Sequence, residues 1–221
     1  PPGATASVRS PRARWARTTS PCRAAGLAVS PSGGRDFWGH PLPDGGYLMT
    51  PTGSNLGELD PARLSKLDAK GSHLDGDKPT KESFLHIAMY EERARSAAVV
   101  HLHSTYSTAV SVLEDVDPED VLPPLTAYYV MRIGTLPLVP YFAPGDMNLA
   151  QAVRRFAGRH HAVLLANHGP VVAGSSLSAA ADAIEELEAT AKLHLTLHGR
   201  ACRCLTPEQV AELKSKFPAQ A

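Results

Sequence analysis

The chain has 221 residues, 43% hydrophobic and 20% charged, which is the composition of a globular protein with a sizeable core. Its 22 basic residues balance its 22 acidic residues, so the net charge indicates neither a nucleic-acid partner nor a membrane partner. Cys22, Cys202 and Cys204 lack the spacing of a disulfide framework, and no apolar run approaches the roughly 20 residues that span a bilayer. We therefore expect a cytoplasmic protein.

The first 43 residues differ in composition from the rest of the chain. They contain seven Pro and six Arg but no Lys or Glu, and they have no helical or alternating hydrophobic period. A segment of this composition is normally disordered. Because the pattern changes abruptly near Asp44, a wrong reading frame or a wrong start is the alternative. We predict that residues 1–43 are atypical in one of these ways and that the domain covers 44–221.

From a turn near Gly45 onward, short strands alternate with amphipathic helices. A helix start is expected at Asp60 as the N-cap, with Pro61 in the first helical position. The other predicted helices cover 81–95, 105–113, 149–160 and 178–197, and a last one follows Thr206. Buried strands are predicted over 97–103, 137–141 and 162–166. This alternation favours a layered α/β domain.

Three histidines follow two of the apolar strands. His101 and His103 close the run 97–103, and side chains two residues apart on a strand point to the same face. His168 follows the strand 162–166, and Gly169-Pro170 after it permits a sharp turn and a close backbone approach. Imidazole is a common ligand of zinc and neighbouring transition metals, so we expect a metal site at one sheet edge.

Three polar groups elsewhere could complete an active site. Glu82 is either a first-turn carboxylate favoured by the helix dipole or a metal ligand that acts as a general acid/base when displaced. Thr80 and Lys81 at the same helix start suit an anion such as phosphate. The segment 50–54 is either a second anion cradle, in which the Gly53 amide approaches closely, or a plain turn.

Together these motifs resemble the class II aldolase and adducin-head family, which includes fuculose-phosphate aldolase and ribulose-phosphate epimerase. The resemblance covers about residues 44–217. It rests on the segment 47–53, on Glu82, on His101-Leu102-His103 and on Asn167-His168-Gly169. It implies a three-layer α/β/α sandwich whose central, largely antiparallel sheet has helices on both faces.

Within this family the chain is most similar to the 3-oxo-tetronate 4-phosphate decarboxylases, through the segments 76–82, 101–105 and 122–132. The similarity implies a carbon–carbon lyase that converts a phosphorylated sugar acid to dihydroxyacetone phosphate and CO2 through a metal-stabilised enediolate. One alternative is a sugar-phosphate aldolase of the fuculose-phosphate type. The other is a non-catalytic module like the adducin head.

The resemblance also assigns roles to individual residues. Glu82, His101, His103 and His168 would hold one divalent metal per subunit, expected to be Zn²⁺, and Glu82 would be the acid/base. The substrate and its phosphate would contact Thr52, Gly53, Thr80, Lys81, Tyr128 and Tyr129.

One of the two tyrosines would reach a neighbouring subunit's site, because the family forms homotetramers with active sites between subunits. Family members also carry a Gly-Asn-Xaa-Ser loop that helps to hold phosphate. Residues 1–43 contain no such loop, so we expect impaired phosphate binding if that segment is genuine.

Overall fold

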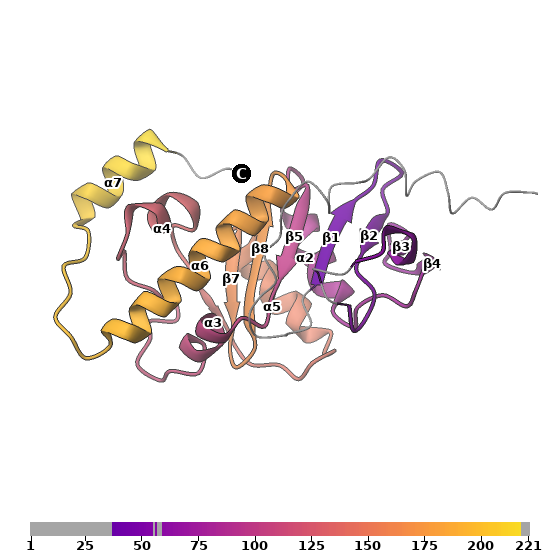
Figure 1. The fold of residues 1–221 in the computed structure, drawn as a ribbon. Helices are drawn as coiled ribbons and strands as arrows, with labels where there is room; N and C mark the ends of the chain where they lie inside the picture. Colours follow the sequence, from indigo (N-terminus) through magenta and orange to yellow (C-terminus); the bar gives the residue numbers. More distant parts are fainter. Residues whose placement is uncertain (1–36, 55, 57–58, 218–221) are drawn as a thin grey trace, which may run out of the picture.

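The computed structural model describes residues 37–54, 56 and 59–217, which form one mixed sheet between two layers of helices (Figure 1). The strand order is β4-β3-β2-β1-β5-β8-β7-β6, and each pairing in the described chain is antiparallel except β6–β7. The strands are β1 (Phe37–Pro41), β2 (Tyr47–Met49), β3 (Ser65–Leu67), β4 (His73–Asp75), β5 (Ala98–His101), β6 (Leu138–Val139), β7 (Ala162–Leu165) and β8 (Gly169–Gly174).

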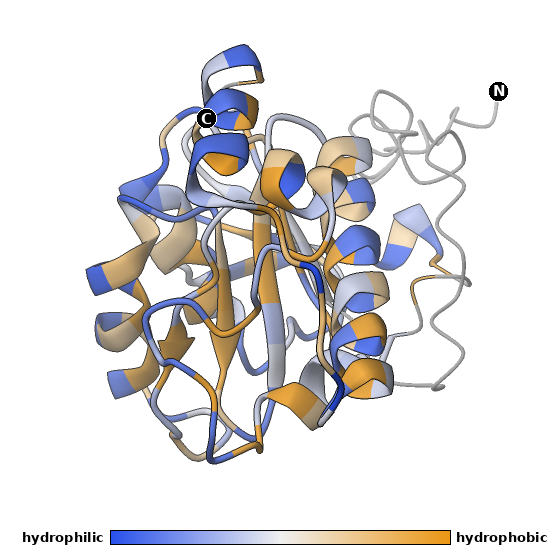
Figure 2. Ribbon diagram, turned by 90° about the vertical axis from the view of Figure 1, so that its left-hand side faces the viewer, coloured by the Kyte–Doolittle hydropathy of each residue, from blue (hydrophilic) through white to orange (hydrophobic). Residues whose placement is uncertain are grey.

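Helices cover both faces of this sheet. On one face lie α2 (Ser83–Glu92) and α5 (Asn148–Ala157), and on the other lie α3 (Thr105–Val110), α4 (Ala127–Arg132) and α6 (Leu177–Leu197). The last helix, α7 (Pro207–Lys216), packs on α4, and a 3-10 turn, η2, covers Pro61–Arg63. Figure 2 shows the apolar strands between helices whose outer faces are hydrophilic.

Alternation along the strands divides the core between the two faces. Val99 and Val171 pack with α2 and α5, whereas their neighbours Val100 and Val172 pack on the side of α6. The predicted three-layer α/β/α sandwich with a largely antiparallel sheet is confirmed. No helix in the described part of the chain combines the length and apolar character that crossing a membrane requires.

Local sequence signals start several of these helices. Asp60 accepts a hydrogen bond from the Ala62 amide at 2.9 Å, as predicted, but the helix that it begins is only the short η2. Thr206 caps α7 in a capping box with Gln209. Ser176 caps α6 by accepting from the Ala179 amide.

Among the described residues, regular structure already occurs at β1, before the predicted start near Gly45. Strand β1 lies at the centre of the sheet, between β2 and β5, and the side chain of Trp38 is 2% exposed. This strand is hard to predict from the sequence because it contains Gly39 and Pro41, and both residue types are depleted in strands. Gly39 packs closely on α2, where a Cβ would lie 3.3 Å from His86 Nδ1. Residues 1–36 lie outside the described residues, so the prediction for them stays a prediction.

Strand β8 begins with two residues that are unusual in strands. The sequence predicts a sharp turn beside Gly169-Pro170. The turn lies just before them, at 166–168, and both residues themselves begin β8. Pairing with β5 and β7 on both sides outweighs the poor strand preference of Gly and Pro. Strand β5 is shorter than predicted and ends at His101.

Candidate metal centre

Four side chains predicted to bind a metal meet at the end of β5. Glu82 Oε2 lies 3.3 Å from His101 Nε2, and Glu82 Oε1 lies 3.3 Å from His168 Nε2. The Nε2 atoms of His103 and His168 are 2.9 Å apart. One potential ligand atom from each of the four residues lies within 4.8 Å of the others. The structure thus brings together residues that are 86 positions apart in sequence.

The antiparallel pairing of β5 with β8 explains this convergence. His101 lies opposite Val171, so the end of β5 adjoins the start of β8, and His168 immediately precedes β8. His103 lies beyond the end of β5, so strand alternation does not align it with His101. The rings of the two residues instead meet edge to face, with centroids 4.9 Å apart.

The two loops that carry His103 and His168 touch through their main chains. Leu102 donates its N–H to Pro170 O at 3.2 Å. A Cβ on Gly169 would overlap the Leu102 carbonyl oxygen and lie 3.4 Å from His103 Cα. Only glycine permits this approach, which fulfils the close backbone contact expected from the sequence.

The donor set and its surroundings fit a divalent metal. His101 Nδ1 lies 2.9 Å from Pro170 O, and because a carbonyl only accepts, Nδ1 carries the proton and Nε2 faces the cluster. Glu82 Oε1 is buried and makes no hydrogen bond among the described residues. Three imidazoles and one carboxylate are ligands that zinc and related ions accept.

The protonation states also suit metal binding. Burial opposes ionisation of Glu82, but its contact with His101 and the nearby His168 and His103 outweigh this and lower the pKa of Glu82 to about 2. Burial and the neighbouring His101 lower the pKa of His103 to about 4, and burial lowers the pKa of His168. At neutral pH Glu82 is therefore a carboxylate and His103 a neutral imidazole, the forms that metals bind.

The two segments predicted to bind phosphate lie side by side. The Thr52 amide donates to Lys78 O at 2.9 Å, and the Thr80 amide donates to Thr50 O at 3.2 Å. Thr52 and Lys81 are exposed, whereas Thr80 is buried and its hydroxyl accepts a 3.3 Å hydrogen bond from the Glu82 amide. Thr80 thus connects the candidate phosphate segment to the candidate metal ligand.

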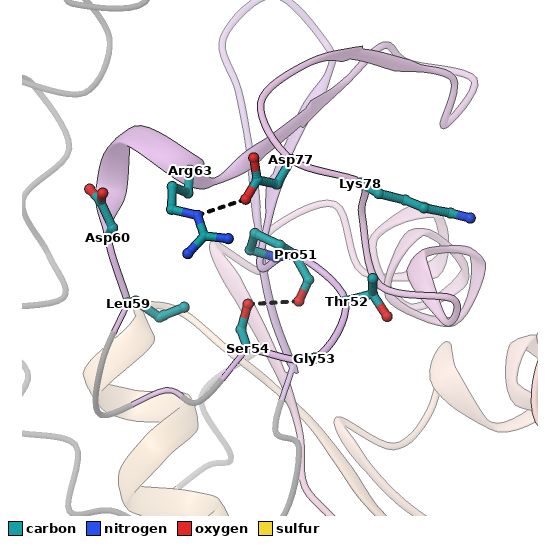
Figure 3. A pocket seen from close by; sticks show the side chains of 9 residues that line it. All are labelled: Pro51, Thr52, Gly53, Ser54, Leu59, Asp60, Arg63, Asp77 and Lys78. Carbon is teal, nitrogen blue, oxygen red and sulfur yellow. Dashed lines mark hydrogen bonds and ion pairs between the residues drawn. The ribbon is translucent and has the colours of Figure 1, made fainter.

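A cavity of about 490 Å³ adjoins these segments (Figure 3). It is lined by Thr52, Gly53 and Lys78, and also by Arg63, whose Nε lies 2.7 Å from Asp77. Figure 3 shows the Lys78 side chain extending away from this ion pair. None of the four candidate metal ligands lines this cavity.

The two adjacent tyrosines differ in what they can reach. Tyr129 is fully buried in the core beside α6, and burial raises the pKa of its hydroxyl. The side chain of Tyr128 is 63% exposed. Only Tyr128 is therefore accessible to a neighbouring subunit's site, and that role stays a prediction.

Sequence reasoning missed Thr108, which touches the loop of His168. Its hydroxyl donates to the His168 carbonyl oxygen at 2.9 Å, across 60 residues of sequence. Thr108 lies inside a predicted helix, where a threonine is unremarkable, so no local signal marks it.

Comparison with known proteins places the chain in a family. The profile of the class II aldolase and adducin N-terminal domain matches residues 29–195. The chain belongs to this class II aldolase family. The match begins before the domain boundary predicted at residue 44, in agreement with the central position of β1. The family and the Glu82–histidine cluster together indicate a divalent metal.

Among the relatives of this chain are both decarboxylases and aldolases. The 3-oxo-tetronate 4-phosphate decarboxylase of Escherichia coli K12 is 56% identical over 174 residues, covering 79% of this chain and 82% of the relative. The L-fuculose phosphate aldolase of the same strain is 31% identical over 176 residues, covering 78% and 79%. The crystal structure of YgbL from Escherichia coli matches with a TM-score of 0.80 and 49% identity, covering 92% of this chain and 97% of that one.

Proposed function

We propose that this protein is a metal-dependent 3-oxo-tetronate 4-phosphate decarboxylase that releases CO2 and dihydroxyacetone phosphate. The observation that carries the proposal is the 56% identity to a decarboxylase of that name, against 31% to an aldolase. The cluster of buried Glu82 and His101 with half-buried His103 and His168 supports metal chemistry and argues against a non-catalytic module. Zn²⁺ is the ion that we propose, because it readily accepts imidazole and carboxylate ligands.

Glu82, His101, His103 and His168 would hold the metal, and Glu82 would also move a proton. A divalent ion held there would supply positive charge to the substrate oxygens on which negative charge develops as CO2 leaves. Because the pKa of Glu82 is about 2, this side chain is a carboxylate at neutral pH and donates a proton only after accepting one.

The hydroxyl on C2 of the substrate is the source that we propose for this proton. When the C1–C2 bond breaks, C1 leaves as CO2 and the electron pair stays on the substrate. Glu82 then returns its proton to C2, and solvent restores the proton on the C2 oxygen. The product is dihydroxyacetone phosphate, and Glu82 is again a carboxylate.

The phosphate of the substrate is proposed to bind at Thr52, Gly53 and Lys81. Buried Thr80 would support this site indirectly, through the hydrogen bond that its hydroxyl accepts from the Glu82 amide. The exposure of Thr52 and Lys81 and the main-chain bonds between their segments support this assignment. We also propose a cytoplasmic homotetramer in which Tyr128 reaches a neighbouring subunit's site.

A substrate comparison tests the proposal. Zinc-loaded protein is given the 3-oxo-tetronate 4-phosphate in each stereochemical form, and separately L-fuculose 1-phosphate, and dihydroxyacetone phosphate is measured with a coupled reductase. Product from the oxo acid, with equimolar CO2, is the expected result. Product only from the sugar phosphate would make the protein an aldolase instead. No bound divalent metal and no product from either compound would favour the non-catalytic module.

A further inference from the structure

The short helix α3 contacts both loops that carry candidate metal ligands. It begins at Thr105, two residues after His103. From its other side, Thr108 donates its hydroxyl to the His168 carbonyl oxygen at 2.9 Å, and the Asn167 amide donates to Ser111 O at 3.4 Å. The helix therefore adjoins His103 in sequence and His168 in space.

The loop of His168 is held by contacts from outside it. Asn167 has a φ of 57°, a left-handed conformation that is uncommon outside glycine, although Asn adopts it more readily than most residues. Contacts with the surrounding structure help to fix such a conformation. Two of the hydrogen bonds that hold this turn come from α3 and its C-terminal residue, and a third joins the His168 amide to Leu165 O at 3.2 Å.

The position of α3 is itself set by a carboxylate from another helix. Ser104 occupies the N-cap of α3 but makes no side-chain capping bond there. Glu188 of α6 takes that role, accepting from the Tyr106 amide at 2.8 Å, the Ser107 amide at 2.9 Å and the Ser107 hydroxyl at 2.7 Å. A carboxylate at a helix N-terminus is favoured by charge as well as by hydrogen bonding.

The long helix α6 provides a rigid base for this arrangement. It covers 21 residues, and its inner face is buried against the sheet beside α3 (Figure 1). We propose that Thr108 is a positioning residue for the candidate ligand His168, and that Glu188 holds the helix from which Thr108 acts. This inference rests on the metal site proposed above, and neither residue touches the metal or the substrate.

The expected effect follows from how narrowly metals tolerate ligand displacement. Ligand distances in metal sites vary by only about 0.2 Å, and loss of a group that bonds a ligating side chain typically weakens metal affinity about 10- to 100-fold. Thr108 bonds the main chain of His168 instead, so we expect an effect at the lower end of this range. Thr108→Val keeps the shape of the side chain and removes the hydroxyl. It should weaken metal binding within that range, and Thr108→Ser, which keeps the hydroxyl, should restore most of the affinity.

The experiment measures Zn²⁺ affinity by competition with a chelator and the visible absorption of Co²⁺-loaded protein, which reports ligand geometry. Thr196→Val is the matched control, because the Thr196 hydroxyl donates to Lys192 O at 2.7 Å on the exposed part of α6. We expect weaker binding and an altered cobalt spectrum for Thr108→Val, with Thr108→Ser and Thr196→Val close to the unmodified protein.

Three outcomes would overturn the inference. One is an unchanged affinity and spectrum for Thr108→Val, and another is a Thr108→Ser variant as weak as Thr108→Val, which would assign the effect to packing. If circular dichroism shows that Thr108→Val does not fold, Glu188→Ala is measured in its place. An unchanged cobalt spectrum for Glu188→Ala is then the third outcome that would overturn the inference. If the unmodified protein binds no divalent metal, the proposed function itself fails. If the unmodified protein binds the metal and one of the three outcomes above occurs, only the inference about Thr108 fails.

Discussion

Replacing Gly169 by alanine tests whether main-chain contact between two loops sets the metal centre. Gly169 has no left-handed φ, so alanine is compatible with its backbone conformation. The added Cβ would overlap the Leu102 carbonyl oxygen, and relieving this overlap separates the two loops by roughly 1 Å. His103 lies on one of these loops and His168 on the other, so their separation pulls two candidate ligands apart.

The size of the effect follows from that displacement. An overpacking substitution in a tight interior costs about 1–3 kcal/mol of the free energy of unfolding. Because metal sites tolerate ligand shifts of only about 0.2 Å, we expect Gly169→Ala to weaken Zn²⁺ binding by about 100-fold or more. Urea unfolding of the metal-free protein and chelator competition measure these two quantities separately.

Gly158→Ala is the matched control for Gly169→Ala. Gly158 caps α5 with a φ of −63°, and its added Cβ would lie 3.6 Å from Glu92 Oε2, an ordinary contact. This variant should keep its metal affinity. Its free energy of unfolding should rise by about 0.4–1 kcal/mol, because alanine restricts the conformations of the unfolded chain. The reasoning is refuted if Gly169→Ala unfolds at the same urea concentration as the unmodified protein and binds Zn²⁺ equally well.

Three further predictions concern single side chains. Glu82→Gln should keep part of the bound metal and lose turnover, whereas His103→Ala should lose both; equal metal loss by elemental analysis would make Glu82 purely a ligand. Burial lowers the pKa of His86 from 6.5 to about 3. Between these two pH values the folded chain binds fewer protons than the unfolded chain, so the free energy of unfolding falls as the pH falls. His86→Gln should therefore reduce the pH slope of urea unfolding of the metal-free protein between pH 6.5 and 5 by up to about 1.4 kcal/mol per unit, and an unchanged slope would contradict this. Tyr128→Phe should lower turnover without changing metal affinity, and unaltered kinetics would remove Tyr128 from the proposed site.

Local sequence was informative wherever a signal lies within a few residues. Thr206 and Asp60 begin their helices because their side chains bond to amides two or three positions away. The apolar runs that become β5 and β7 are short, continuous and followed by histidine. The four candidate metal ligands could therefore be singled out from motifs, although the family resemblance was needed to assign Glu82.

Other features depended on distant partners. Strand β1 contains Gly39 and Pro41 and becomes a central strand only because β2 and β5 pair with it on both sides. Thr108 gains its contact with His168 only after α3 packs beside the β7–β8 turn. Tyr128 and Tyr129 are identical and adjacent in sequence, and only packing against α6 buries one and exposes the other.

The sequence by itself determined which side chains form the candidate metal centre, because residue type and spacing specify the chemistry. Only the tertiary structure decided how these groups meet. His101 and His168 come together through the antiparallel register of β5 with β8 and through the absence of a side chain at Gly169. Both features are contacts between segments more than 60 residues apart in sequence. A local sequence pattern cannot predict them, because their energy depends on which distant segments pack together.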